Sequence, residues 1–185
     1  SPKIVRAMFR RLQIMGPPGS GKSTLAEAVA GRIGARYVDL DPLFWGPNWM
    51  PRPDEVFRAA VDAATVEDAW VIGANYSRVR DLVWGRAQAV VWLDLPLVRV
   101  LQRLLSRTVK RVVTGQELWS GNRETWRAAF FSRESLFPFS VRQHGRFRRE
   151  LPALLAAPEW RHLKVWRLRS PAEVAEWLGG VAAGF

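Results

Sequence analysis

The sequence predicts one three-layer α/β domain in which a parallel β-sheet is covered by helices on both faces. Three observations carry this prediction. Short apolar runs alternate with amphipathic helical patterns along most of the chain, an order typical of βαβ units. The first apolar run leads directly into the glycine-rich segment GPPGSGKS, a common junction between a buried strand and a helix. The 185 residues suffice for one substantial core, so a single domain is expected over 1–185.

The first half of the chain is predicted to be βαβαβ. The run RLQIM at 11–15 is a short buried strand that ends at the glycine-rich segment. A helix is predicted to start at Lys22 and to stop at Gly34, because glycine readily adopts the left-handed conformation that ends helices. Pro53 opens a second helix, since proline fits the first helical turn. The other two strands are predicted at 36–41 and 69–76.

The second half continues this alternation but contains one irregular stretch. Helices are predicted at 79–85, at 97–113 and near 147–157, with strands at 88–96 and 162–168. Residues 115–145 show poor periodicity and are rich in Arg, Phe and Trp, which indicates an inserted segment. Ser170, Pro171 and Glu173 form the pattern of a capping box and predict a last helix.

Charge and cysteine content narrow the possible functions. The 28 Lys and Arg outnumber the 17 Asp and Glu, for a net charge of +11, which predicts an anionic partner, either a polyphosphate or a nucleic acid. A solvated basic face is the alternative. The absence of cysteine excludes a disulfide framework and a thiolate zinc site, and fits a cytoplasmic protein. No uncharged apolar run reaches about 18 residues, so no membrane partner is expected. The oligomeric state is left open.

The segment GPPGSGKS matches the phosphate-binding pattern G-x-x-x-x-G-K-[ST] in the expected strand–loop–helix context. Its glycines let backbone N–H groups point inward, where the helix N-terminus adds partial positive charge. Lys22 is placed to bridge the β- and γ-phosphates of ATP, Ser23 to bind Mg²⁺ and Thr24 to meet the α-phosphate. The predicted nucleotide-binding residues are Gly16, Pro17, Pro18, Gly19, Ser20, Gly21, Lys22, Ser23 and Thr24.

Two carboxylates follow at the predicted end of the second strand. Asp39 and Asp41 are two residues apart, so on a strand they would share a face at the sheet edge where α/β proteins bind ligands. Asp39 is predicted to serve the metal, and Asp41 to orient or deprotonate an acceptor hydroxyl. The alternative is a polar strand end that leads into a turn.

Aromatic side chains predict an acceptor-binding surface, and arginines predict a charged stripe along one helix. Trp45 and Trp49 could form a wall for a planar acceptor, although aromatic residues after a strand also commonly cover the core. Arg103, Arg107 and Arg111 recur at every fourth position of the long predicted helix. Such a stripe can stabilise the charge on a transferring phosphoryl group, or it can be a solvated basic face.

These segments together carry a family resemblance. GPPGSGKST, VDLD followed by FWGPNW, WVIGANY, VVWLDLP and LQRLLSR resemble the adenylate-kinase-like P-loop kinases, and within them the topology modulation protein group. The resemblance implies a five-stranded parallel sheet in the order 2-3-1-4-5, a mobile helical lid at about 112–148, and phosphoryl transfer from ATP with Mg²⁺. It also implies a catalytic pair, Arg103 and Arg107, and a D-x-D pair similar to that of shikimate and gluconate kinases.

The same resemblance defines the remaining site predictions and one departure. Asn75 and Tyr76, in WVIGANY, are expected to bind the acceptor together with Asp41, Trp45 and Trp49. Relatives often carry an aspartate where this chain has Gly73, so Asp39 is expected to be the main metal carboxylate, with Asp94 as a substitute. The catalytic set is then Lys22, Asp41, Arg103 and Arg107, and the metal set is Ser23 and Asp39.

The resulting hypothesis is an ATP-dependent kinase of a nucleoside, nucleotide or similar small acceptor. Two alternatives remain open at this point. One is a nucleotide-regulated nucleic-acid-binding protein, suggested by the arginine excess and the family label. The other is a nucleotide-binding protein that has lost catalysis, suggested by Gly73.

Overall fold

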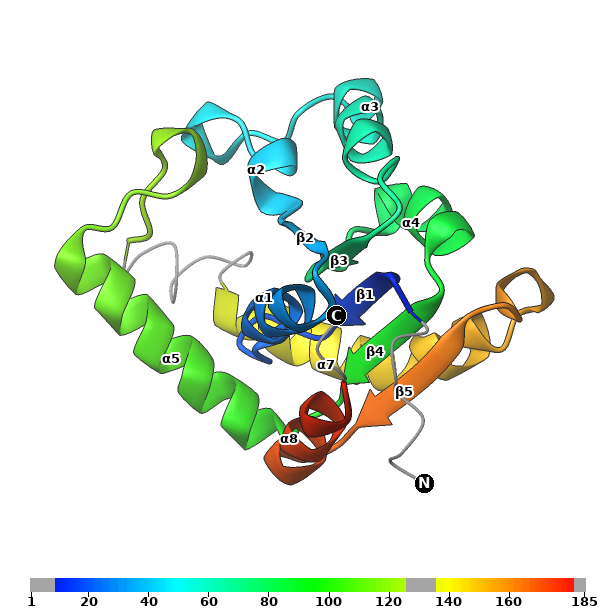
Figure 1. Ribbon diagram of the computed structural model, residues 1–185. Coiled ribbons are helices and arrows are strands. Elements are labelled where there is room, and N and C mark those ends of the chain that lie inside the picture. Colours follow the sequence, from blue (N-terminus) through cyan, green and yellow to red (C-terminus); the bar gives the residue numbers. More distant parts are fainter. Residues whose placement is uncertain (1–8, 126–135, 182–185) are drawn as a thin grey trace.

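The computed structural model describes residues 9–125 and 136–181 and has a five-stranded parallel sheet at its centre (Figure 1). The strand order is β2-β3-β1-β4-β5, which confirms the predicted order and fold class. The strands are β1 (Arg11–Met15), β2 (Arg36–Val38), β3 (Trp70–Ile72), β4 (Ala89–Leu93) and β5 (Lys164–Leu168). Every pairing is parallel, so the carboxyl ends of all strands meet at one edge.

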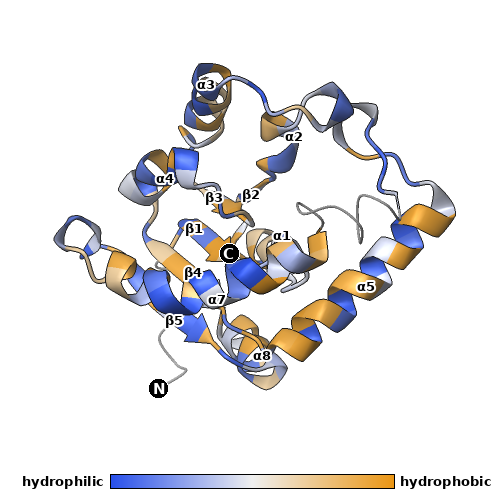
Figure 2. Ribbon diagram, turned by 180° about the vertical axis from the view of Figure 1, so that it is seen from behind, coloured by the Kyte–Doolittle hydropathy of each residue, from blue (hydrophilic) through white to orange (hydrophobic). Residues whose placement is uncertain are grey.

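Helices cover both faces of the sheet and create two apolar cores. On one face, α1 (Lys22–Ile33) and α8 (Pro171–Gly180) pack against the sheet through residues such as Val29 and Trp177. On the other face lie α3 (Asp54–Ala64), α4 (Arg80–Arg86) and α7 (Leu136–Leu155), which contribute Phe57, Trp84 and Phe147. Strand β4 is buried throughout, whereas β5 at the sheet edge is partly exposed and carries hydrophilic colour in Figure 2. The three-layer prediction is thereby confirmed.

The long helix α5 (Leu97–Thr114) runs diagonally along one side of the molecule and ends at Gly115 (Figure 1). Gly115 adopts the left-handed conformation with φ 59°, as does Gly34 at the end of α1 with φ 65°. Both stops agree with the sequence prediction. At the start of α8, the Ser170 hydroxyl accepts from the Glu173 backbone N–H at 3.1 Å. The Glu173 carboxylate accepts instead from the Arg169 backbone N–H, one residue earlier than in a strict capping box.

The second strand is shorter than predicted, and this corrects the placement of the carboxylate pair. Strand β2 ends at Val38, and Asp41 is the first residue of the short helix α2 (Asp41–Phe44). The side chain of Asp39 accepts from the backbone N–H of Asp41 at 3.0 Å. This local hydrogen bond competes with continued strand pairing. Asp39 and Asp41 are therefore brought together by a turn, and the prediction that they share a strand face is wrong.

Helix α7 extends into the stretch that was predicted to be irregular. It begins at Leu136, well before the expected start near 147. Pro138, Gly145 and Pro152 weaken the helical pattern in the sequence, but tertiary contacts secure the helix. The Ser140 hydroxyl donates to the Pro18 carbonyl oxygen at 2.8 Å, and His144 Nε2 lies 2.9 Å from the Leu95 carbonyl oxygen. Part of the predicted lid, 126–135, lies outside the described residues, so the lid at 112–148 stays a prediction.

Within residues 9–125 and 136–181, no helix combines the length and the apolar content needed to cross a lipid bilayer.

Candidate active site

The glycine-rich loop between β1 and α1 adopts a conformation that depends on its glycines. Gly19 and Gly21 have φ values of 89° and 88°, which side chains of L-residues strongly disfavour. A Cβ atom on Gly19 would lie 2.4 Å from the carbonyl oxygen of Val100. The backbone of α5 therefore packs directly against this loop, and the loop conformation is coupled to the position of α5.

Polar groups in the loop are arranged for a phosphate chain. Ser20 Oγ is buried without a hydrogen-bond partner among the described residues. Lys22 makes no ion pair within the described part of the chain, although it lies in the field of Asp41 and Asp39. Together with the inward-facing loop at the start of a twelve-residue helix, these groups fit a nucleotide polyphosphate.

Asn75 connects the loop to the end of β3. Its side-chain Oδ1 accepts from the Gly16 backbone N–H at 3.0 Å, and its Nδ2 donates to the Gly16 carbonyl oxygen at 2.7 Å. Both polar atoms of the side chain are thus bound to the loop. These two hydrogen bonds give Asn75 a positioning role at the loop, and its contact with an acceptor stays a prediction.

Burial lowers the pKa of Lys22 to about 8, because removing the ammonium from water disfavours its charged form. The negative charge of Asp41 opposes this effect, and the positive charge of Arg107 adds to it. A bound polyphosphate would stabilise the ammonium and raise the pKa again. Nucleotide binding above pH 8 is therefore coupled to the uptake of a proton.

This coupling predicts that the Kd for ATP rises with pH. The protonated lysine is the binding form, so affinity is constant below about pH 8 and falls above it. Between pH 7 and 9.5 we expect Kd to increase about thirtyfold. Titration calorimetry over this range, in two buffers of different ionisation enthalpy, measures both Kd and the proton uptake. A Kd that stays constant to pH 9.5 would contradict the coupling.

The carboxylates lie opposite the loop with defined partners. The Tyr76 hydroxyl donates to Asp41 Oδ1, and the Trp45 side chain lies near Tyr76. Burial and the Asp41 charge raise the pKa of Tyr76, so it remains a donor over the physiological range. Burial also raises the pKa of Asp39. The predicted acceptor residues Asp41, Trp45 and Tyr76 thus form one connected group.

The tryptophan loop that follows α2 has an unusual backbone. Asn48 and Trp49 both have φ 55°, a left-handed conformation that is rare for non-glycine residues. The Trp49 ring packs edge-on against Trp45 at 5.5 Å between centroids. Both indoles are half-buried. Trp45 packs against the core, and Trp49 packs on Trp45. This intermediate arrangement agrees with both alternatives drawn from the sequence.

A hairpin-like segment at 116–124 docks on this loop, and sequence reasoning missed it. Asn122, which is buried, accepts from the Trp49 backbone N–H at 3.0 Å and donates to the Gly46 carbonyl oxygen at 2.9 Å. The Trp119 ring centroid lies 6.3 Å from that of Trp49, and its side chain lies near Asp39. The turn residues WSGN were the available signal. The segment after α5 therefore covers the tryptophan loop, which carries two of the predicted acceptor residues.

Loss of the Asn122 amide is predicted to loosen this enclosure. Asn122→Ala removes two hydrogen bonds to backbone groups of the tryptophan loop and should destabilise the docked state by about 2 kcal/mol. The exchange of the Trp49 amide hydrogen is then expected to accelerate more than tenfold. Gln116→Ala, in the same segment but exposed, is the matched control. Equal exchange rates in the two variants would show that Asn122 does not hold the loop.

The arginine stripe of α5 divides into three roles. Arg103 donates to the Ser20 carbonyl oxygen at 3.2 Å, which places it at the phosphate loop. Arg107 is largely buried, its Nε lacks a partner among the described residues, and burial lowers its pKa. Arg111 forms a buried ion pair with Glu124 at 2.7 Å. Two of the three arginines therefore lie toward the candidate site, and the third holds the hairpin segment.

Asp94 was considered as a metal carboxylate, and Gly73 stands where relatives often carry one, but packing and ion pairs account for both residues. Asp94 is 3% exposed and binds Arg148 at 2.7 Å and Arg167 at 2.7 Å, so it is not free to serve a metal. A Cβ atom on Gly73 would lie 3.0 Å from both Ala26 Cβ and Ser23 Cα. Strand β3 approaches α1 so closely that a side chain at Gly73 would require its neighbours to move by a few tenths of an ångström.

Oxygen donors for a cation are few but present. No cluster of three or more His, Asp or Glu residues is found in the described ranges. Ser23 is exposed and lies near Tyr37, which is also in the field of Asp39. A hydroxyl and a carboxylate fit Mg²⁺ that is bound mainly through phosphates and water.

Comparison with known proteins agrees with this geometry. Residues 12–94, somewhat less than half of the chain, match the model of the AAA family, ATPases associated with various cellular activities. The chain is 28% identical over 144 residues to a shikimate kinase of Synechococcus elongatus, covering 64% of this chain and 73% of that protein. It is 24% identical over 131 residues to mouse threonine synthase-like 1, where the match spans 63% of this chain but only 17% of the relative.

Solved structures show the same arrangement of elements. A gluconokinase from Sinorhizobium meliloti superposes with a TM-score of 0.53 at 20% identity, covering 94% of this chain and 90% of that one. A shikimate kinase from Acinetobacter baumannii in complex with shikimate gives 0.52 at 15% identity, with coverages of 95% and 92%. The chain has a P-loop kinase fold. Its resemblance to the adenylate kinase side of that fold stays a prediction.

Proposed function

We propose that this P-loop protein is a phosphotransferase that moves the γ-phosphoryl group of ATP to a hydroxyl of a small acceptor. The observation that carries the proposal is the placement of Asp41. Its carboxylate lies in the field of Lys22 in the phosphate loop and accepts a hydrogen bond from Tyr76. A nucleotide-binding loop that faces an oriented carboxylate is the arrangement that transfer to a hydroxyl requires.

The chain's own residues supply the donor side. Backbone N–H groups of the glycine-rich loop and the ammonium of Lys22 would hold the β- and γ-phosphates. Arg107, partly buried and without a partner for Nε in the described residues, is placed to neutralise charge that spreads over the transferring group. Arg103 is tied to the Ser20 carbonyl oxygen and would position the loop as well as contribute charge.

On the acceptor side, Asp41 would accept the proton of the attacking hydroxyl while Tyr76 keeps the carboxylate oriented. Trp45 and Trp49 would line the acceptor, and the segment at 116–124 would exclude water from it. Ser23 and Asp39 would hold Mg²⁺, which when bound would supply positive charge to the phosphates.

An acceptor panel tests the proposal. Sugar acids, cyclic polyols, nucleosides and nucleotides are each added with Mg·ATP, and ADP formation is followed with ADP-coupled detection. One class is expected to raise turnover far above the basal rate. The panel thus distinguishes a sugar-acid or cyclic-polyol acceptor, of the kind that the names of the relatives indicate, from the predicted nucleoside or nucleotide acceptor. Intact ATP binding without stimulation by any acceptor would contradict the proposal and support the alternative of lost catalysis.

The nucleic-acid alternative has a separate readout. Binding through phosphate contacts must weaken linearly with the logarithm of salt concentration. The basic surface of α7 is partly neutralised, because Arg146 pairs with Glu150 and Arg148 with Asp94. A steep salt dependence that is lost on charge reversal of Arg149, with ATP binding unchanged, would favour that alternative.

A further inference from the structure

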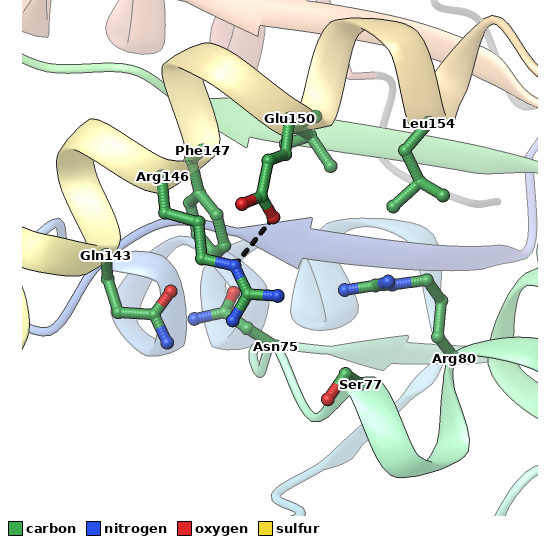
Figure 3. Close-up of a pocket in the computed structure, with 9 residues that line it drawn as sticks. Asn75, Ser77, Arg80, Gln143, Arg146, Phe147, Glu150 and Leu154 are labelled. Carbon is green, nitrogen blue, oxygen red and sulfur yellow. Dashed lines mark hydrogen bonds and ion pairs between the residues drawn. The ribbon is translucent and has the colours of Figure 1, made fainter.

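A small polar cavity lies between α4 and α7, and its lining does not include the carboxylates and tryptophans of the candidate active site. Its volume is about 50 Å³, which has room for a few water molecules or one small oxyanion. Figure 3 shows its side chains converging from both helices and from the end of β3. The lining residues are Asn75, Ser77, Arg80, Gln143, Arg146, Phe147, Glu150, Leu151 and Leu154.

Two guanidinium groups face this cavity from opposite sides (Figure 3). Arg80, on α4, is half-buried and stacks on Trp84 at 5.3 Å, and no described residue accepts a hydrogen bond from it. Arg146, on α7, donates from Nε to Glu150 at 2.6 Å, which leaves its two terminal nitrogens available. Glu150 balances one positive charge, so one remains uncompensated. Burial and the nearby Arg146 lower the pKa of Arg80, as expected for a cation that lacks a counter-charge.

Uncharged polar groups complete the lining. Ser77 offers a hydroxyl, and Gln143 has a buried Oε1 without a hydrogen-bond partner in the described part of the chain. A buried polar atom of this kind costs free energy unless water or a ligand satisfies it. Asn75, which follows β3, lines the same cavity and also holds Gly16 of the phosphate loop through two hydrogen bonds.

We propose that this cavity binds one small oxyanion, a phosphate, sulfate or carboxylate group, between the guanidinium groups of Arg80 and Arg146. Two guanidinium groups can bind such a group with parallel N–H···O hydrogen bonds, and the oxyanion supplies the counter-charge that Arg80 lacks. The oxyanion could be a free ion or the anionic end of an acceptor. The binding site does not depend on the proposed kinase activity.

The test measures the thermal unfolding midpoint with the phosphate loop filled by saturating Mg·ADP. Inorganic phosphate is then added against KCl of equal ionic strength. The native protein is expected to gain about 3 to 6 °C at a phosphate concentration of ten times Kd. Arg80→Gln is expected to abolish the gain. Arg149→Gln removes the same charge from exposed α7 surface outside the cavity and should retain it.

The same measurements are repeated in a Lys22→Ala variant, which lacks the phosphate-loop lysine. The test therefore does not depend on ADP to block phosphate binding at the loop. Ser77→Ala, a milder change, should weaken phosphate binding severalfold without affecting the midpoint measured without phosphate. Three outcomes would overturn the proposal. Phosphate raises the midpoint of Arg80→Gln as much as that of the native protein, it fails to raise the midpoint of the native protein, or Arg149→Gln loses the rise as fully as Arg80→Gln.

The two sources of the oxyanion are separated by competition. With an acceptor from the panel, phosphate that raises the acceptor KM without changing kcat places the acceptor's anionic group in the cavity. Phosphate that stabilises the protein but leaves the acceptor KM unchanged identifies a free oxyanion.

Discussion

Asp41→Asn is expected to lower kcat for acceptor phosphorylation by about 10² to 10⁴, the range that a positioned general base contributes. Asparagine has nearly the same shape, and its side-chain oxygen can still accept from the Tyr76 hydroxyl that now binds Asp41 Oδ1. What the variant loses is the ability to take a proton. The measurement is steady-state ADP formation with an acceptor identified in the panel, together with Kd for ATP, which should change by less than threefold.

Asp54→Asn provides the matched control for that variant. Asp54 is an exposed carboxylate at the start of α3, paired with Arg78 at 2.7 Å, and a surface pair of this kind contributes little. Its kcat should equal that of the native protein. Turnover by Asp41→Asn within threefold of the control would remove Asp41 from the catalytic set and leave Asp39 as the remaining carboxylate at the site.

Gly73→Asp is expected to destabilise the protein by about 3 kcal/mol or more and to lower the unfolding midpoint by at least about 6 °C. The new Cβ would come within 3.0 Å of Ala26 Cβ and Ser23 Cα and within 3.1 Å of the Lys22 carbonyl oxygen. Two of these neighbours are backbone atoms at the start of α1, which cannot move without disturbing the phosphate loop. Thermal denaturation and Kd for ATP measure both consequences.

Gly31→Asp separates close packing from the general cost of replacing a glycine. Gly31 lies on the exposed side of α1, and a Cβ there meets nothing within 4 Å. Its midpoint should change by no more than about 2 °C. If Gly73→Asp were as stable as this control and more active than the native protein, the glycine would be a lost catalytic carboxylate and not a packing requirement.

The local elements were predictable because each depends on residues close together in sequence. Strand β1 and the start of α1 occur where the apolar run and the glycine-rich segment placed them. Predictions failed where a short-range pattern competed with distant contacts. Helix α7 contains Gly145 and two prolines, yet it forms because Phe147 and Leu151 are buried against the sheet.

The candidate site shows the same division. The sequence identified Lys22, Asp39, Asp41 and Tyr76, since a loop motif and strand ends locate them. It did not reveal that the Asn75 side chain binds Gly16, 59 residues away. It also missed Asn122, whose partners at Gly46 and Trp49 are 76 and 73 residues away.

By itself, the sequence determined that this protein has a phosphate-binding loop inside an alternating α/β domain, with carboxylates after the second strand. Hydrophobic periodicity, glycine and proline determine backbone structure over a few residues, so these features can be predicted from short stretches of sequence. Only the tertiary structure decided which polar groups meet. It brought Trp119 near Asp39, packed Gly73 closely against the start of α1, and placed Arg80 and Arg146 around one cavity. Such contacts follow from packing two apolar cores on one sheet, a constraint of the whole chain.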